Sequence, residues 1–364
     1  MSTKSTETQG ILSLPLARVA AGLVALGVAG FAFGILGGHA ARTVSDLVAS
    51  WLFFTGIAVG GLAFTAILRL CGARWAAPMY DGAWRIAAFI PLAAVLLVAV
   101  IACLAVWAPW VSSMAPRDAF WLALPSFAGR EAVVSALLLT VAYRVVRPHV
   151  RDGGNSTPLF ITYALLFSLI VSIWSFDFVV GPTAGWNSTL IGPHLFVGSF
   201  LSGIGVTILL ALRKDSLSVS QRRDAGTLVF VLAIFWGYLS WSQFLTLWYG
   251  NLPEEVGVLI RRNTFAWRGL AGLVIVLIAA LPFVLLLNSK ARTSKKILAV
   301  AATSQLLGLW LERGLMVTPA LGGADAQPFD FAGLAVALGV LGLFVLSTWR
   351  VVLAPGQTPV AVGG

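Results

Sequence analysis

The chain has 364 residues, of which 59% are hydrophobic and only 10% are charged, and its formal net charge is +10. Because an ordinary soluble domain carries about 25% charged residues, this composition excludes a soluble globular protein and indicates a polytopic membrane protein. In a soluble protein the excess of positive charge would suggest nucleic acid as a partner. Here the positive residues sort by loop, so membrane orientation explains them and no nucleic-acid partner is predicted.

Few residues in the chain could bind a metal. Its only cysteines are Cys71 and Cys103, without a CxxC pair, and its only histidines are His39, His149 and His194. This inventory argues against a disulfide framework, an iron–sulfur cluster, a zinc site or a haem with two His ligands. We therefore predict that the chain itself binds no metal, and that any redox metal belongs to a partner.

Ten apolar stretches are each long enough to cross a bilayer, which takes about 20 residues. They predict an all-α integral membrane protein with a short N-terminal tail (1–15), a transmembrane domain (16–350) and a C-terminal tail (351–364). The predicted spans are 16–38, 46–70, 84–107, 119–146, 158–178, 189–212, 226–249, 266–288, 297–317 and 331–350.

Positive residues gather in the loops that follow the even-numbered spans. Fourteen Lys and Arg lie there, against six at the loops and span ends of the other side. The positive-inside rule then predicts that both termini are cytoplasmic. The loop between spans 5 and 6, and the segment 250–255 after span 7, are predicted to face the outer side.

Four charged residues interrupt the predicted spans. Arg130 and Glu131 lie about eleven residues into span 4, close to its middle at about 1.5 Å per residue, and Glu312 and Arg313 lie inside span 9. A charge at mid-bilayer costs roughly 2.5–3.5 kcal/mol, so each needs a partner or a function. Neighbouring helical positions point about 100° apart, so we expect Arg130 and Glu131 to meet different helices. The two arginines are predicted to form interhelical ion pairs, and the two glutamates to lie on a proton path.

Asp177 stands near the outer end of span 5, and His194 begins span 6. The loop between them could bring both side chains to one pocket, where a carboxylate and an imidazole can accept protons from a hydroquinone. Helix-breaking Gly-Pro pairs at 181–182 and 192–193 favour such a pocket. The alternative is an Asp that caps a helix and a His hydrated at the headgroups.

Four stretches resemble the NrfD/polysulfide-reductase membrane-subunit family, and more closely the two ten-span subunits of alternative complex III, with the greater likeness to the second of these. The stretches are "LALPSFAGREAVV" (122–134), "SIWSFDFVVGPTAGWNSTLIGPHLFVGSFLSG" (172–203), "FLTLWYGNLPEEVGVLIRR" (244–262) and "GLWLERGLMVTPAL" (308–321). The resemblance implies two four-helix bundles, spans 2–5 and 6–9, flanked by spans 1 and 10. It also implies a place in the bacterial inner membrane and quinol oxidation at the outer face.

The expected partners are an iron–sulfur subunit docked on the outer face, a homologous membrane subunit and cytochrome c subunits, which hold the iron–sulfur clusters and haem c. The expected function is that of a membrane subunit of a quinol-oxidising complex. The alternatives are a proton-conducting or structural sister subunit without its own quinol, and a secondary transporter. The site residues expected are Asp177 and His194 as catalytic groups, Trp186, Ser188 and Thr189 at the quinol, and Glu131, Glu254, Glu255 and Glu312 on the proton path.

Overall fold

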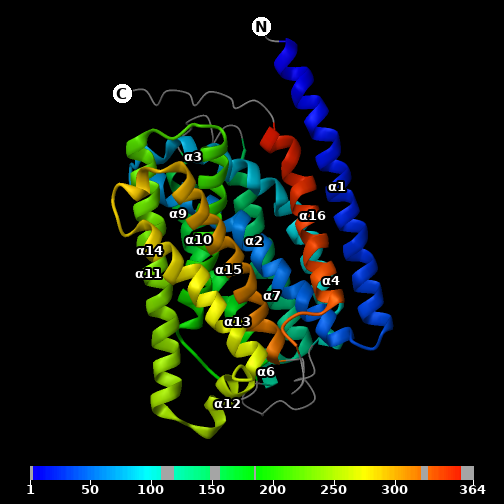
Figure 1. The fold of residues 1–364 in the computed structure, drawn as a ribbon. Helices are drawn as coiled ribbons and strands as arrows, with labels where there is room; N and C mark the ends of the chain where they lie inside the picture. The colour runs from blue at the N-terminus through cyan, green and yellow to red at the C-terminus, as the bar shows by residue number, and fades with distance from the viewer. Residues whose placement is uncertain (1–2, 108–118, 148–155, 184–185, 321–326, 354–364) are drawn as a thin grey trace.

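A computed structural model describes residues 3–107, 119–147, 156–183, 186–320 and 327–353 (Figure 1). The described part is helical and contains no strand. Nine of its helical segments are long and apolar enough to cross a membrane. The prediction of an all-α integral membrane protein of about ten spans is therefore confirmed.

Each predicted span corresponds to a helix or to a run of consecutive helical turns. The main elements in chain order are α1 (Thr3–Leu36), α2 (Ala40–Leu70), α3 (Ala77–Ile86), α4 (Ile90–Ala102), α5 (Leu104–Trp107), α6 (Ala119–Leu122), α7 (Leu124–Val145), α9 (Thr157–Ser175), α10 (Ile191–Arg213), α11 (Val219–Gly250), α12 (Pro253–Arg261), α13 (Phe265–Ile275), α14 (Leu281–Leu286), α15 (Lys295–Val317) and α16 (Phe331–Leu353). The shorter turns are η1 (Arg74–Ala76), η2 (Ala87–Phe89), η4 (Phe176–Val180), η5 (Val276–Ala280), η6 (Ala291–Thr293) and η7 (Thr318–Ala320).

The spans form two four-helix bundles. In the first, α2 packs on α4 and α9, and α7 closes the ring by contacting both of these; in the second, α10 packs on α11 and α15, which enclose α13 and α14. Helices α2 and α10 pack against each other and join the bundles, while α1 and α16 pair at one side of α2 (Figure 1).

Small residues let α2 and α10 approach closely. A side-chain Cβ at Gly60 would lie 2.0 Å from the carbonyl oxygen of Ser199, and one at Gly203 would lie 2.1 Å from the backbone nitrogen of Gly61. Neither position has room for a larger residue, because backbone atoms cannot move aside as a flexible side chain can.

The segment predicted as span 4 is broken near its start. Ala123 has an extended backbone (φ −57°, ψ 136°) and Pro125 occupies the first turn of α7, so α6 and α7 are separate helices. Arg130 consequently lies six residues into α7, or about 9 Å along its axis. The prediction that Arg130 and Glu131 lie close to the middle of their span is wrong, and both lie nearer one end of the bundle.

Two spans contain a π-helical turn. The η4 turn follows α9 without a break and includes Asp177, and η5 joins α13 to α14. One residue more per turn rotates the following backbone, and such turns are frequent at functional sites. The turn therefore sets the direction in which Asp177 points.

The N-terminal tail and span 3 differ from their predicted limits. Helix α1 begins at Thr3, so the tail expected at 1–15 is helical over most of its length. Span 3, predicted from residue 84, is helical from Arg74, and Arg85 is buried in α3, where its Nε donates to Asp81 at 2.7 Å. This ion pair allows the helix to include polar residues that hydropathy places outside it.

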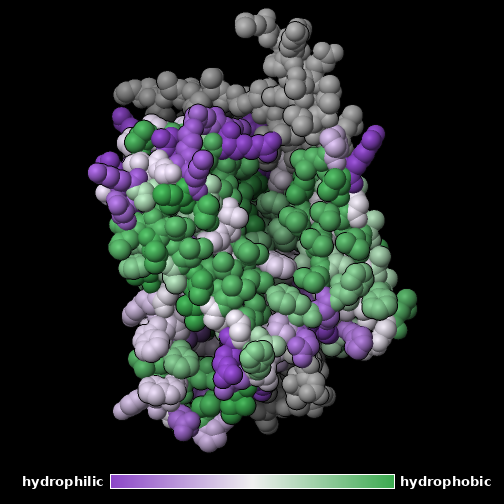
Figure 2. Space-filling view, viewed as in Figure 1, coloured by the Kyte–Doolittle hydropathy of each residue, from purple (hydrophilic) through white to green (hydrophobic). Residues whose placement is uncertain are grey.

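One end of the molecule, here called the basic face, carries the loops rich in Lys and Arg. Figure 2 shows strongly hydrophilic side chains at this end and a broad hydrophobic belt beneath them. Between α10 and α11, the exposed Asp215 pairs with Lys295, and this hydrogen bond and charge lower the pKa of the Asp215 carboxyl. The Lys and Arg of the basic face, among the described residues, are Arg69, Arg74, Arg144, Arg147, Arg213, Lys214, Arg222, Arg223, Lys290, Arg292, Lys295 and Lys296.

Candidate functional site

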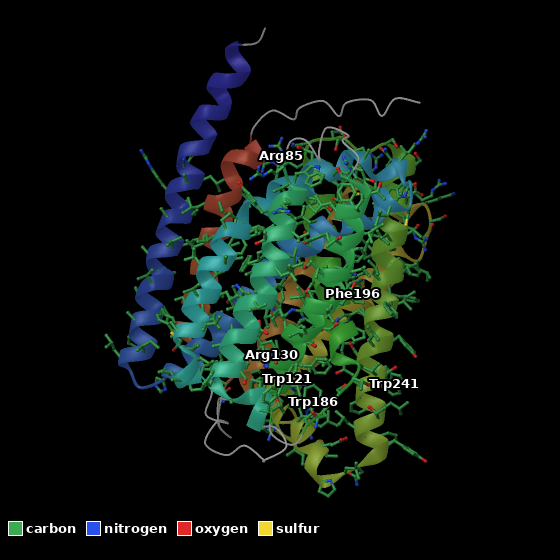
Figure 3. All side chains as sticks on the ribbon, turned by 180° about the vertical axis from the view of Figure 1, so that it is seen from behind. Arg85, Trp121, Arg130, Trp186, Phe196 and Trp241 are labelled. Carbon is green, nitrogen blue, oxygen red and sulfur yellow. The ribbon has the colours of Figure 1, made fainter. Side chains whose placement is uncertain are left out.

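Buried polar side chains gather toward the end opposite the basic face. Figure 3 shows Arg130, Trp121 and Trp186 near this opposite face, whereas Arg85 lies at the other end. The charged side chains toward the opposite face form three clusters, one in each bundle and one between α2 and α16.

The first-bundle cluster is built around Asp177, which is fully buried. Arg130 donates to both carboxylate oxygens, from Nε at 2.8 Å and from Nη2 at 2.9 Å, and Trp121 Nε1 donates at 2.8 Å. The guanidinium also lies over the Trp121 ring, 3.9 Å from its centroid. The bidentate, stacked geometry fixes Asp177 firmly, and the interhelical ion pair expected of Arg130 is confirmed.

Glu131 faces the same carboxylate as Arg130. It is fully buried, its carboxyl faces that of Asp177, and its Oε2 is 3.5 Å from Ser135 Oγ. Trp174 Nε1 donates to that hydroxyl at 2.9 Å. The expectation that Arg130 and Glu131 meet different helices is wrong, because the long arginine side chain reaches back to the helix that Glu131 faces.

The second-bundle cluster joins His194, in the first turn of α10, to Glu312 of α15. His194 Nε2 lies 2.8 Å from Glu312 Oε1, and Trp236 Nε1 donates to the same oxygen at 2.7 Å. The His194 ring packs at its edge on Trp236, with centroids 5.5 Å apart. All three side chains are buried, so the interaction is little screened by water.

Gln243 decides the tautomer of His194. Its Nε2 lies 2.8 Å from His194 Nδ1, and an amide nitrogen can only donate. Nδ1 therefore accepts, and in the neutral ring Nε2 carries the hydrogen and donates to Glu312. The result is a hydrogen-bonded series from Gln243 through His194 to Glu312.

Arg313 balances the charge of Glu312. Its Nη1 donates to Glu312 Oε2 at 2.6 Å, so the ion pair joins neighbouring residues of one helix. The prediction that Arg313 forms an interhelical ion pair is thus wrong. Its guanidinium folds back along α15 into a space left by Gly198 of α10. A Cβ at Gly198 would lie 2.4 Å from Arg313 Nη2.

Arg262 and Trp186 adjoin this cluster at the opposite face. Arg262 Nη2 donates to the carbonyl of Met316 at 3.2 Å, and Arg313 Nη1 contacts the sulfur of the same methionine at 3.6 Å. The Arg262 guanidinium lies 5.7 Å from the centre of the Trp186 ring. Arg262 Nε and Trp186 Nε1 are buried without a hydrogen-bond acceptor among the described residues.

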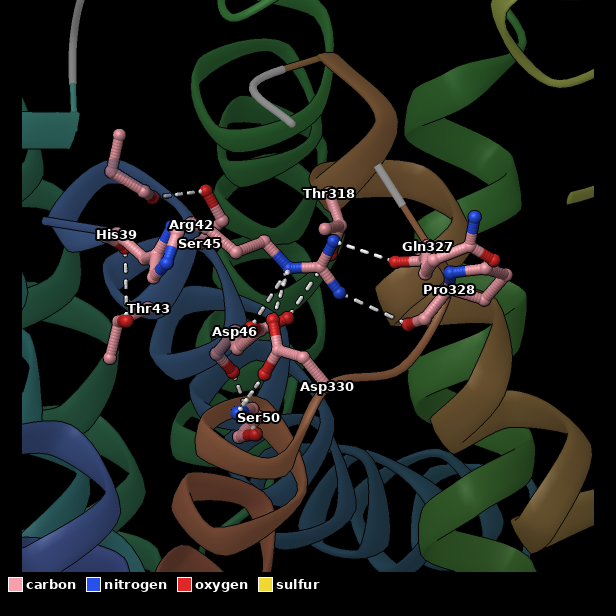
Figure 4. A network of polar contacts seen from close by, with 12 residues as sticks. His39, Arg42, Thr43, Ser45, Asp46, Ser50, Thr318, Gln327, Pro328 and Asp330 are labelled. Carbon is pink, nitrogen blue, oxygen red and sulfur yellow. Dashed lines mark hydrogen bonds and ion pairs between the residues drawn. The ribbon is translucent and has the colours of Figure 1, made fainter. Parts of the chain in front are cut away.

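The third cluster links α2 to the segment before α16 (Figure 4). Arg42 donates to Asp46 Oδ2 at 3.0 Å and to the carbonyls of Gln327 and Pro328 at 2.8 and 3.1 Å. Its Nε also lies 3.6 Å from Asp330 Oδ2. Arg42, Asp46, Pro328 and Asp330, with parts of α15, line a cavity of about 50 Å³, which is room for water.

The sequence grouped Asp177 with His194, but the structure places them in different clusters. Asp177 pairs with Arg130, and His194 pairs with Glu312, which the sequence had assigned to a separate proton path. Trp186 is buried, whereas Ser188 is half-buried and Thr189 is exposed. Glu255 is half-buried at the start of α12; the side chain of Glu254 lies outside the described part.

Sequence reasoning missed several members of these clusters. Asp46 follows Arg42 by four residues, a spacing at which a helical ion pair is expected, and this signal was readable. Trp121, Trp236 and Gln243 gave no comparable signal, because aromatic and amide side chains are common near membrane interfaces.

Comparison of the chain with protein-family models and with curated protein sequences gives no match.

Proposed function

We propose that the chain is a membrane subunit of a quinol-oxidising electron-transfer complex of the bacterial inner membrane, related to the NrfD-like subunits. Its site for quinol and protons lies in the second bundle, at the opposite face. Electrons pass to an iron–sulfur subunit docked on that face, and cytochrome c subunits and a homologous membrane subunit complete the assembly.

The buried His194–Glu312 pair carries this proposal. A hydroquinone loses two protons and two electrons on oxidation, so its site needs a base that works near neutral pH. An imidazole held by a carboxylate meets this need. In this bundle Glu312 Oε1 accepts from the His194 ring at 2.8 Å, while Arg313 keeps the carboxylate charged.

Arg262 and Trp186 supply donors for the ring oxygens. Each has a buried N–H group without an acceptor among the described residues, and a buried donor left unpaired costs about 1–3 kcal/mol. A quinone carbonyl oxygen accepts such hydrogen bonds. Met316 connects these donors to Arg313, so the ring would lie beside the Glu312 cluster.

In this arrangement the chain handles the protons and the partner handles the electrons. One quinol hydroxyl gives its proton to Nδ1 of His194, in place of the hydrogen bond from Gln243, and the imidazolium is stabilised by Glu312. The imidazolium releases this proton to water, and the second hydroxyl then gives its proton by the same route. Two protons reach water and two electrons leave for the partner's cluster, so the product is the quinone.

Asp177 favours a second candidate, a proton-conducting sister subunit without its own quinol. Both oxygens of Asp177 already accept hydrogen bonds from Arg130 or Trp121. A substrate hydroxyl would have to compete with these three donors for the carboxylate oxygens. In this candidate the quinol belongs to the homologous partner, and Glu312 and His194 conduct protons only.

The test begins with purification of the tagged chain from its native membrane, followed by measurement of iron, haem and partner masses. In the intact complex, His194→Asn and Glu312→Gln are expected to lower quinol turnover by about 10²–10⁴-fold, the usual contribution of a general base. His39→Asn is the matched control, because His39 is exposed. Full turnover in both variants, or a chain that purifies without redox partners, would refute the proposal.

Retained quinol binding separates the two candidates. If the His194→Asn complex loses proton release but a quinol analogue still binds to the sister subunit, the second candidate is favoured. If Trp186→Phe and Arg262→Gln raise KM for quinol, the ring lies in this chain.

A further inference from the structure

The first bundle contains one more buried carboxylate than the partly buried Arg130 can balance. The described charged groups that face Glu131 are Arg130, on its own helix, and Asp177, on the π-helical turn after α9. Ser135 and Trp174 complete its surroundings, and neither is charged. Two carboxylates and one guanidinium would leave a net charge of −1 in the bundle.

The cation is already committed to Asp177. Arg130 uses Nε and Nη2 on that carboxylate and Nη1 on the carbonyl oxygen of Trp121, 3.0 Å away. Glu131 is 0% exposed, so water does not solvate it either. An isolated ionised carboxylate in an apolar interior is strongly unfavourable, and such groups bind a proton instead.

The position of Glu131 indicates where the proton is shared. Its Oε1 is buried and has no hydrogen-bond donor among the described residues, and its carboxyl faces that of Asp177, which is buried as fully and is held by Arg130. Two ionised carboxylates cannot hydrogen-bond to each other, since both only accept. One added proton turns this repulsive contact into an O–H···O⁻ hydrogen bond, which is among the strong ones.

We infer that Glu131 and Asp177 form a proton-binding site in the first bundle, in which neutral Glu131 donates to ionised Asp177 and Arg130 balances the remaining charge. The second-bundle cluster differs, because Glu312 and Arg313 balance each other there when His194 is neutral. The first bundle thus stores one proton at rest, and the second bundle does not.

This site can exchange its proton with the opposite face. Asp177 is fully buried, but Trp121 is 43% exposed and the Arg130 side chain is 15% exposed, so the cluster extends from the interior to the surface of the bundle. The site shares no residue with the proposed quinol site, and its existence does not depend on quinol chemistry.

Infrared spectroscopy of the purified full chain at neutral pH tests the inference. A protonated carboxyl has a C=O stretching band that an ionised one lacks, and this band shifts in D₂O. The spectra of Glu131→Gln and Asp177→Asn are subtracted from that of the unsubstituted protein. Glu255→Gln serves as the control, because Glu255 is half-buried in α12, apart from this cluster.

Glu131→Gln is expected to remove one such band. Asp177→Asn is expected to remove the same band although Glu131 remains, because Arg130 then pairs with an ionised Glu131. Glu255→Gln leaves the band unchanged. An undiminished band in Glu131→Gln, or a band lost there but kept in Asp177→Asn, would overturn the shared proton.

Thermal unfolding provides a second reading that does not depend on band assignment. Glutamine closely resembles a neutral glutamic acid, so Glu131→Gln is expected to keep the midpoint of the unsubstituted protein. A large drop in that midpoint would mean that Glu131 is ionised and paired, which contradicts the inference.

Discussion

Arg130 and Arg313 neutralise buried carboxylates in two different ways. Arg130 joins two elements of its bundle by holding Asp177 with two hydrogen bonds while stacking on Trp121. Arg313 holds its sequence neighbour Glu312 and leaves the other oxygen of that carboxylate to His194 and Trp236. The first arginine therefore links helices, whereas the second sets the charge of a carboxylate that His194 can use.

Replacement of Arg130 tests this linking role. Arg130→Gln is expected to destabilise the protein by about 3–5 kcal/mol, because it leaves Asp177 buried without its counter-charge. Arg130→Lys should lose less, since a lysine keeps the charge but lacks the bidentate geometry. Unfolding in detergent measures both, with the exposed Arg144→Gln as the control for loss of charge. Equal stability of Arg130→Gln and Arg144→Gln would contradict the assignment.

The sequence predicted which charged residues need a partner, but only in part which partner each one has. The cost of charge in a membrane singled out Arg130, Glu131, Glu312 and Arg313 correctly as residues that need partners. Their partners were assigned incorrectly in part, because the direction of a side chain depends on the rotation of its helix and on turns such as η4. Neither quantity follows from hydropathy.

Helices α2 and α10 form the centre of the protein. Over the most apolar 18 residues of each helix, 89% of the residues in α2 and 67% of those in α10 are buried, whereas only 22% are buried in α1. Without a hydrophobic force between helices in lipid, close packing of small residues holds such helices together. The close contact between α2 and α10, which joins the two bundles, thus depends on the glycines at 60 and 203.

A larger residue at Gly203 is expected to destabilise the contact between α2 and α10. Gly203→Ala brings a Cβ to within 2.1–2.7 Å of the α2 backbone, so we expect a loss of about 1–3 kcal/mol or more from overpacking. Gly272→Ala is the matched control, because a Cβ there meets nothing within 4 Å. Thermal unfolding of the two variants measures the difference. A Gly203→Ala protein as stable as Gly272→Ala would show that α2 and α10 lie farther apart at this position than described.

Helix limits were predictable where they coincide with the limits of apolar runs. The start of α7 was not, because the break at Ala123 lies within an apolar stretch and follows from the local backbone and Pro125. The beginning of span 3 also escaped prediction, since the Asp81–Arg85 pair allows polar residues inside a helix.

The molecule as a whole is asymmetric along its long axis. Hydrophilic side chains gather at the basic face (Figure 2), whereas Arg130 and Trp121 of the first-bundle cluster, and Trp186 beside the second, lie toward the opposite face (Figure 3). The positive-inside rule favours a cytoplasmic basic face. The proposed chemistry would then take place near the outer side, where protons can be released outward.

Cysteine labelling tests this orientation. Cys71 is exposed where α2 ends at the basic face. In a Cys103→Ser protein, a membrane-impermeant maleimide is expected to label Cys71 only from the cytoplasmic side. A cysteine introduced by Thr189→Cys in a protein without native cysteines is expected to react only from the other side. Labelling of Cys71 in intact cells would reverse the orientation and the predicted direction of proton release.

By itself, the sequence determined the class of the protein, the course of its helical spans and the end of the molecule at which its Lys and Arg gather. These follow from hydropathy and loop charge, which are local properties that the bilayer reads directly. Only the tertiary structure decided which charges meet. His194 pairs with a residue 118 positions away and Arg130 with one 47 positions away. Such pairs depend on the order of helices in each bundle and on their rotation, because polar groups in lipid must find partners across helices.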